Sequence, residues 1–230
     1  MRFVPPLVSG RLLGRRKRFF ADVRLDDGRT VVAHLPNTGS MRGCSTPGSR
    51  CWIAPAAGRG RRLAWTLELV ESGGVLVSVN TARTNALVAE ALARGGIPPL
   101  AGAARIAREV RVGDSRLDFV LERAGRRTLV EVKNVSLVED GLALFPDAPT
   151  ARGRRHLELL AERARRGERA VMLFVVARAD GKVLAPAEAI DPAYAEALRR
   201  AAAAGVEVLA RRARITPARI ELGGAVPVRL

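Results

Sequence analysis

Two strand-like segments on either side of one short turn constrain this chain most. Residues 117–121 and 129–134 are rich in branched and aliphatic side chains, and the polar residues between them include Gly125. This pattern predicts a β-hairpin. If the turn is symmetric, with its centre just before Gly125, Asp118 lies directly opposite Glu131. Opposed strand residues have Cβ atoms about 4.5–5.5 Å apart, so two carboxylates there should repel each other unless a cation lies between them.

The residues around this pair suggest metal-assisted phosphate chemistry. Lys133 follows Glu131 by two positions, so both side chains project from the same strand face. Asp118 and Glu131 could hold Mg²⁺ or Mn²⁺, with Glu90 on a predicted preceding helix as a further metal ligand. Such an ion polarises a phosphoryl oxygen, and the Lys133 ammonium could stabilise charge on the phosphate. An exposed strand, with Asp118 paired to Lys133 or to an arginine, would explain the same residues without a metal.

The overall charge indicates a polyanionic partner. The formal net charge is +16 and the pI is about 11.5. Such a surplus favours nucleic acid over a membrane surface. Nearly all of the 39 basic residues are arginine, which a GC-rich genome would also produce. No secretory signal precedes the first strand, and the longest apolar run, residues 170–177, is too short to span a bilayer, so a cytoplasmic protein without membrane partners is expected.

Residues 1–80 are expected to form an all-β domain. Short strands separated by turns, with no convincing helix in so few residues, predict a small OB-like barrel. Its strands are expected at residues 7–13, 19–25, 30–35, 50–53, 64–70 and 75–79. Cys44 and Cys51, the only cysteines, are expected to be small buried residues of this domain.

Two loops of this domain are candidates for contact with nucleic acid. Four consecutive cations precede two phenylalanines: they are Arg15, Arg16, Lys17 and Arg18. Basic side chains contact phosphates and aromatic rings stack on bases in OB folds that bind single strands. A solvated turn followed by two core phenylalanines would suit the same residues. Residues 36–43 could present backbone N–H groups and hydroxyls to a phosphate, or form a long turn rich in Asn and Gly.

Residues 81–230 are expected to form an α/β domain with a mixed sheet. The predicted order is helix, three strands, helix, strand, helix and strand. The helices are expected at residues 86–93, 151–166 and 193–204, the first capped by Thr84 or Asn85, and residues 211–217 are expected to be a basic loop. The start of the second helix carries further candidate contacts to nucleic acid: Arg152, Arg154, Arg155 and His156. Cations at this end oppose the helix dipole, which an anionic ligand would explain, as would a surface enriched in arginine.

The chain resembles the sugar fermentation stimulation protein A (SfsA) family almost end to end. Many short motifs occur in order, at residues 16–19, 21–23, 36–41, 79–81, 115–119, 130–135, 145–148 and 152–157. The resemblance implies an N-terminal OB-like domain and a C-terminal domain similar to PD-(D/E)xK nucleases. In that pattern Asp118, Glu131 and Lys133 occupy the Asp, Glu and Lys positions. Pro149 and Ala151 depart from the family in detail.

The family is described as binding DNA without sequence specificity and has been linked to maltose use. These observations together predict a DNA-binding protein with a Mg²⁺-dependent phosphodiesterase site and no organic cofactor. The alternatives are a catalytically silent DNA-binding regulator linked to sugar (maltose) metabolism and an RNA-binding protein. The sequence does not distinguish single-stranded from double-stranded DNA, and it does not give the oligomeric state.

Overall fold

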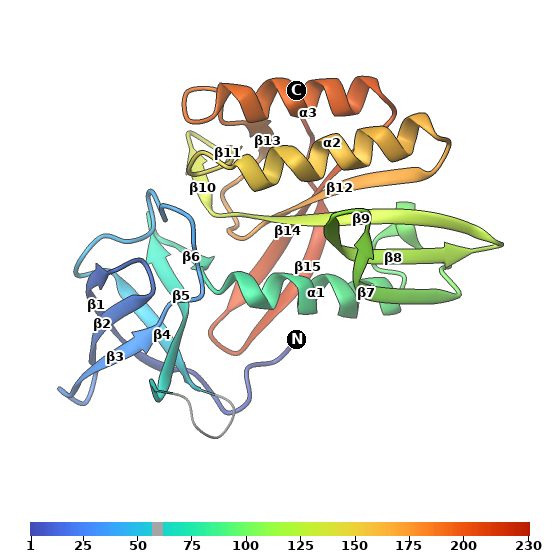
Figure 1. The fold of residues 1–230 in the computed structure, drawn as a ribbon. Coiled ribbons are helices and arrows are strands. Elements are labelled where there is room, and N and C mark those ends of the chain that lie inside the picture. Colours follow the sequence, from blue (N-terminus) through green and yellow to red (C-terminus); the bar gives the residue numbers. More distant parts are fainter. Residues whose placement is uncertain (57–61) are drawn as a thin grey trace.

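Strands β1 to β5 close into a barrel, shown in blue and cyan in Figure 1. The computed structural model of the protein describes residues 1–56 and 62–230. Neighbouring barrel strands pair in the order β3, β2, β1, β4 and β5, and a parallel pairing of β3 with β5 closes the ring. A further strand, β6, pairs with β5. The strands are β1 Val8–Arg16, β2 Phe20–Leu25, β3 Thr30–His34, β4 Arg50–Pro55, β5 Trp65–Ser72 and β6 Val75–Ser78. The expected OB-like barrel is confirmed.

Alternating side chains build the barrel core. Ala21, Val23 and Leu25 of β2 are buried on one face, as the period of a strand requires. Cys44 and Cys51 are buried free thiols, as the sequence predicts, and burial raises the pKa of Cys51 to about 12. Both thiols are therefore packing residues of the barrel.

The second domain is built on a mixed six-stranded sheet, in the order β15, β14, β12, β9, β8 and β7. Strand β12 runs parallel to both β9 and β14, and the other pairs are antiparallel. The strands are β7 Arg105–Val112, β8 Ser115–Arg123, β9 Arg126–Val135, β12 Arg169–Val176, β14 Glu207–Thr216 and β15 Arg219–Ala225. The expected mixed sheet is confirmed.

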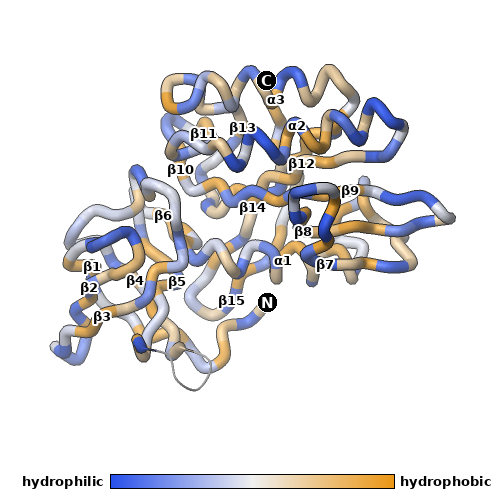
Figure 2. Tube along the Cα trace, viewed as in Figure 1, coloured by the Kyte–Doolittle hydropathy of each residue, from blue (hydrophilic) through white to orange (hydrophobic). Residues whose placement is uncertain are grey.

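Three helices cover this sheet on both faces, and in Figure 1 α1 lies below it while α2 and α3 lie above it. The helices are α1 Thr81–Ala93, α2 Ala151–Arg165 and α3 Pro192–Ala203, with a short 3₁₀ turn, η1, at Pro98–Leu100. One apolar cluster joins α2 and α3 to the sheet, and a second joins α1 to the opposite face. In Figure 2 the hydrophobic colour follows β12, whose residues from Ala170 to Val176 are all buried. This central strand belongs to both clusters.

The sequence placed the start of α1 too late. The helix begins at Thr81, and its cap is Asn80, whose side chain accepts a hydrogen bond from the Ala82 N–H at 3.1 Å. Thr84 and Asn85, the expected caps, lie inside the helix and make long-range hydrogen bonds instead. The polar residues that look like a cap in the sequence therefore lie on the face of the helix that meets β8 and β9.

The expected basic loop at residues 211–217 is also wrong, because β14 continues to Thr216 and forms a hairpin with β15. Ala210 and Ala213 are buried in the clusters on opposite faces of the sheet, and the two arginines between them are partly buried beside a β-bulge, so simple alternation does not mark this strand in the sequence. A small sheet that the sequence did not reveal consists of β10 Leu137–Glu139, β11 Leu142–Phe145 and β13 Val183–Pro186.

A few hydrogen bonds join the barrel to the second domain. The Ser40 hydroxyl donates to the carbonyl oxygen of Asp147 at 2.6 Å, and the Met41 N–H donates to the Asp147 carboxylate at 2.9 Å. Thr81, at the start of α1, donates to the carbonyl oxygen of Pro36 at 2.7 Å. The barrel loop at residues 36–41 is thus fastened beside the edge of the second domain. In the described part of the chain, we find no helix with the length and apolar character needed to cross a membrane.

Candidate metal and nucleic-acid site

The register of the β8–β9 hairpin brings the two carboxylates together. Arg123 pairs with Arg126, and Phe119 with Val130, so the turn has the symmetry that the sequence predicts. The next step in this register is Asp118 opposite Glu131. The regular ladder ends there, and Asp118 turns its carboxylate toward the backbone of β9.

Two hydrogen-bond donors hold the Asp118 carboxylate, and its pKa is raised. Its Oδ2 accepts from the Val132 N–H at 2.7 Å, and its Oδ1 accepts from the Asn85 side chain at 2.6 Å. Burial and then the neighbouring Glu131 carboxylate raise the pKa of Asp118 to about 6. The two carboxylates therefore interact electrostatically, as the hairpin register requires.

Glu131 has one saturated oxygen and one free oxygen. Its Oε1 accepts from Lys133 Nζ at 2.6 Å and also contacts Nδ1 of His156. Burial alone would raise the pKa of Glu131, but His156 and Lys133 outweigh it, so the pKa is lowered and the group stays ionised. Its Oε2 is buried, and no described residue bonds to it. An ionised, buried oxygen without a partner is a position that a cation would satisfy.

The structure does not bring Glu90, the further metal ligand that the sequence suggests, to this pair. Its carboxylate pairs with the N-terminal ammonium of Met1 at 3.1 Å and with Arg94 at 2.8 Å. Asn85 is the residue of α1 that reaches Asp118. Glu90 follows it by five residues, which turns the Glu90 side chain about 140° away around the helix axis. Among residues 1–56 and 62–230, no three His, Cys, Asp or Glu side chains are grouped as a metal site would require. The protein would therefore supply two side-chain ligands.

The cationic run of the barrel divides into different roles. Arg15 is partly buried and donates to the carbonyl oxygens of Asn37, Gly39 and Ser40 at 2.8–3.0 Å, so it holds the barrel loop, and its contact with nucleic acid stays a prediction. Arg16 pairs with Asp22 at 2.5 Å on the surface. Lys17 and Arg18 are exposed in the turn before Phe19, which is 42% exposed. Three of the four cations, Arg16, Lys17 and Arg18, are therefore exposed.

The cluster on α2 divides in the same way. Arg152 and Arg155 are exposed, whereas Arg154 pairs with the buried Asp191 at 3.2 Å. His156 is only 4% exposed and faces Glu131, so the structure does not place it on the surface with the two exposed arginines. Sequence reasoning missed its role because the histidine continues the apolar stripe of α2, and only the packing of α2 on β9 brings it to the carboxylate.

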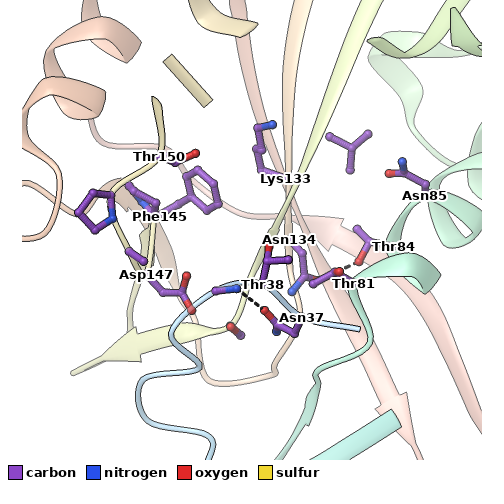
Figure 3. A pocket seen from close by; sticks show the side chains of 16 residues that line it. Asn37, Thr38, Thr81, Thr84, Asn85, Lys133, Asn134, Phe145, Asp147 and Thr150 are labelled. Atoms are coloured by element: carbon purple, nitrogen blue, oxygen red, sulfur yellow. Dashed lines mark hydrogen bonds between the residues drawn. The ribbon is translucent and has the colours of Figure 1, made fainter. Parts of the chain in front are cut away.

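A pocket opens beside Lys133, between the barrel and the second domain. Its volume is about 350 Å³. Figure 3 shows polar side chains around it, from the barrel loop, the start of α1, the end of β9 and the loop before α2. Of these lining residues, only the loop at residues 36–43 and Lys133 were candidates from the sequence. Asn85, Asn134 and Asp147 were missed, because they come from three separate segments without a common motif.

The chain combines an OB barrel with a mixed α/β domain that carries a carboxylate pair on its strands β8 and β9. Residues 13–79 match the family described as "SfsA N-terminal OB domain", and residues 82–219 match "Sugar fermentation stimulation protein RE domain". The chain belongs to the sugar fermentation stimulation protein (SfsA) family.

Relatives and a solved structure agree with this assignment over nearly the whole chain. Proteins from Geobacter sulfurreducens and Chromohalobacter salexigens, each described as a "Sugar fermentation stimulation protein homolog", are both 53% identical over 97% of this chain. The alignments cover 96% and 93% of those proteins. The structure of Pyrococcus furiosus SfsA in complex with Ca²⁺ is 32% identical, with a TM-score of 0.92 over 100% of this chain and 98% of that one.

Proposed function

We propose that this protein binds nucleic acid without sequence specificity and cleaves its phosphodiester backbone with a divalent cation held at Asp118 and Glu131. The observation that carries the proposal is the buried, unpartnered Oε2 of an ionised Glu131 beside a second carboxylate. Two opposed carboxylates repel each other. Lys133 and His156 contact only Oε1 of Glu131, and both donors to Asp118 are neutral, so a cation at the free Oε2 would offset the remaining repulsion.

The ligand chemistry supports Mg²⁺ or Mn²⁺. Both ions prefer oxygen ligands, and Mg²⁺ is commonly held by one or two carboxylates together with waters and substrate phosphates. Two protein carboxylates are what this site offers. When bound, such an ion would polarise a phosphoryl oxygen and lower the pKa of water. The related Pyrococcus furiosus protein, solved with Ca²⁺, supports a role for a divalent cation in this family.

The protein's own residues would position the reaction. Asn85 and the Val132 N–H fix the orientation of Asp118. Lys133 keeps its ammonium beside Glu131, in the place where negative charge would develop on a bound phosphate. His156, buried behind Glu131, holds that carboxylate in one orientation. The net charge of +16 would attract the polyanionic substrate.

A catalytically silent nucleic-acid-binding regulator, which could act on DNA or RNA, is the second candidate. The observation in its favour is that three of the four carboxylate oxygens already have protein donors: both oxygens of Asp118 and Oε1 of Glu131. Such a protein would bind nucleic acid with a strong salt dependence but would not cleave it.

A nuclease assay separates the two. Single-stranded, duplex and flap DNA and RNA are incubated with Mg²⁺ or Mn²⁺, and with EDTA. We expect metal-dependent cleavage that Glu131→Gln abolishes, while the matched change at an exposed strand residue, Glu139→Gln, leaves it intact. Binding without cleavage of any substrate would exclude the phosphodiesterase, and an absence of binding would exclude both candidates. Circular dichroism of each variant confirms that it is folded.

A further inference from the structure

The pocket beside Lys133 has the size of a site for one small organic group. Its volume of about 350 Å³ is at the lower end of the range of about 300–1,000 Å³ that is usual for ligand pockets. Its walls come from the barrel loop at residues 37–39, from α1, from β9 and from residues 145–150. The pocket therefore exists only where the two domains meet.

The pocket walls are held in place by hydrogen bonds that do not involve a ligand. Arg15 fixes the barrel loop from behind through three carbonyl oxygens. Asn37 closes the loop internally by accepting from the Gly39 N–H at 2.9 Å. Asp147 ties the loop to the second domain through Ser40 and Met41. A ligand would thus enter a preformed site, which lowers the entropic cost of binding.

The pocket presents donors and acceptors together. Asn134 accepts from Thr84 through Oδ1 at 2.9 Å, and its amide NH₂ donates to no described residue. Asn85 donates to Asp118, and its Oδ1 accepts from no described residue. Asp147 uses Oδ2 for Met41, so Oδ1 remains available for a donor. A carboxylate in the wall opposes a phosphate but suits the N–H groups on the edge of a nucleobase.

An aromatic ring forms one side of the pocket. Phe145 lines it and is partly exposed. Its ring packs edge-on against Phe174 and Tyr194, with centroids 5.5 and 5.2 Å away, so the ring is fixed in place. Nucleobases stack on such rings in proteins that bind single strands. Figure 3 shows Phe145, Lys133 and Asn134 around the same space.

The pocket also adjoins the carboxylate pair directly. Asn85 lines the pocket and donates to Asp118 at 2.6 Å. Lys133 lines it and donates to Glu131 at 2.6 Å. Two side chains therefore each touch both the pocket and the metal site that we propose. One strand can therefore place a phosphate at the carboxylates and the base of a neighbouring nucleotide in the pocket.

We propose that this pocket receives a single unpaired nucleotide of the bound strand, next to the phosphate at Asp118 and Glu131. A base can enter such a side pocket only when it has left the helical stack, because a paired base is held inside the duplex. The preferred substrate is thus nucleic acid with an unpaired nucleotide, such as a single strand, an end or a bulge, rather than a perfect duplex. This inference rests on the proposed function, since the same strand would lie at the carboxylates.

The test compares binding to two labelled duplexes of equal length, one perfectly paired and one with a single bulged nucleotide. Fluorescence anisotropy is measured in EDTA, so that cleavage plays no part. We expect about tenfold tighter binding to the bulged duplex, which corresponds to ~1.4 kcal/mol and lies within the range for one base stacked on an aromatic ring. A deoxyribonucleotide and a ribonucleotide at the bulge distinguish DNA from RNA as the source of the base.

A blocking variant shows whether this preference comes from the pocket. Thr38 is exposed and lines the pocket, so Thr38→Trp should fill it and remove the preference. Thr46 is an exposed threonine of the same domain outside the pocket, and Thr46→Trp should keep the preference. Thermal unfolding by circular dichroism checks that both variants fold.

The outcomes separate this inference from the proposed function. Equal binding of both duplexes by the unchanged protein, or a Thr38→Trp change that weakens both equally, would overturn the inference and leave the proposed function standing. A preference for the bulge without cleavage in Mg²⁺ would overturn only the proposed cleavage. Failure to bind either duplex, both in EDTA and with Mg²⁺ present, would overturn both.

Discussion

The carboxylate pair should make the metal-free protein less stable at neutral pH, and Asp118→Asn should relieve this. The pKa of Asp118 rises from 3.8 to about 6, first through burial and then through Glu131. A difference of this size corresponds to about 3 kcal/mol at pH values above both pKa values. Asparagine has the same shape and no charge, but one of the two donors that hold Asp118 then meets an amide N–H, which costs about 1 kcal/mol. The variant should therefore be about 2 kcal/mol more stable at pH 8.

The pH dependence fixes the sign of the effect. Between about pH 4 and pH 6 the folded protein binds a proton at Asp118 that the unfolded chain has released. The folded state thus holds more protons, and the stability contributed by this group falls as the pH rises through this window. At pH 4 the carboxyl group is neutral in the folded state, so Asp118→Asn should be slightly destabilising there. The difference between variant and unchanged protein should change sign below pH 6.

The assay is urea unfolding in EDTA at several pH values, followed by far-ultraviolet circular dichroism. Circular dichroism is used because it follows the helices and strands of both domains, whereas Trp52 and Trp65, the only tryptophans, both lie on barrel strands. Asp114→Asn, at an exposed turn position, is the matched control and should change little. A cation at 100 times its Kd should stabilise the unchanged protein by about 2.7 kcal/mol and reverse the order of stability. An Asp118→Asn protein that is no more stable at pH 8 in EDTA would refute this account of the site.

Two further predictions concern the loop between the domains. Gly39→Ala would place a Cβ atom 2.5 Å from Oδ1 of Asp147 and should cost about 1–3 kcal/mol in urea unfolding, whereas Gly14→Ala has free space around it and should cost less than about 0.5 kcal/mol; an equal cost at both glycines would contradict the close contact. Arg15→Met should cost about 2 kcal/mol through its lost hydrogen bonds, while Lys17→Met should preserve stability and reduce the salt slope of nucleic-acid binding by about 1. Identical effects of these two changes in both assays would show that Arg15 has no structural role.

The hairpin could be predicted because its information is local. A polar turn containing Gly125 lies between two strand segments, and its symmetry alone places Asp118 opposite Glu131. Lys133 follows from alternation along one strand. These arguments need only the rise and the period of a strand, which do not depend on the rest of the fold. Asp118, Glu131 and Lys133 therefore lie where the hairpin register predicts, and the structure adds the residues that bond to them.

Residues on helices were harder to assign, because their direction depends on where the helix begins and how it packs. Glu90 and Asn85 lie on the same helix, and only the rotation of α1 decides that Asn85 meets Asp118. His156 has the position of an apolar core residue on α2, and its approach to Glu131 depends on the contact between α2 and β9. No local pattern carries this information, so the sequence did not reveal the ion pairs of Glu90 or the contact between His156 and Glu131.

The barrel loop explains why the site belongs to both domains. Arg15 was a candidate for binding phosphate because of its charged neighbours, but its guanidinium organises the loop that forms one wall of the pocket. The loop in turn needs Gly39, since no side chain fits between it and Asp147. A barrel that only added affinity for nucleic acid would not need this close contact between the loop at Gly39 and Asp147. This contact instead holds one wall of the pocket at a fixed position relative to Lys133. The barrel therefore contributes to the geometry of the pocket as well as to the positive charge around it.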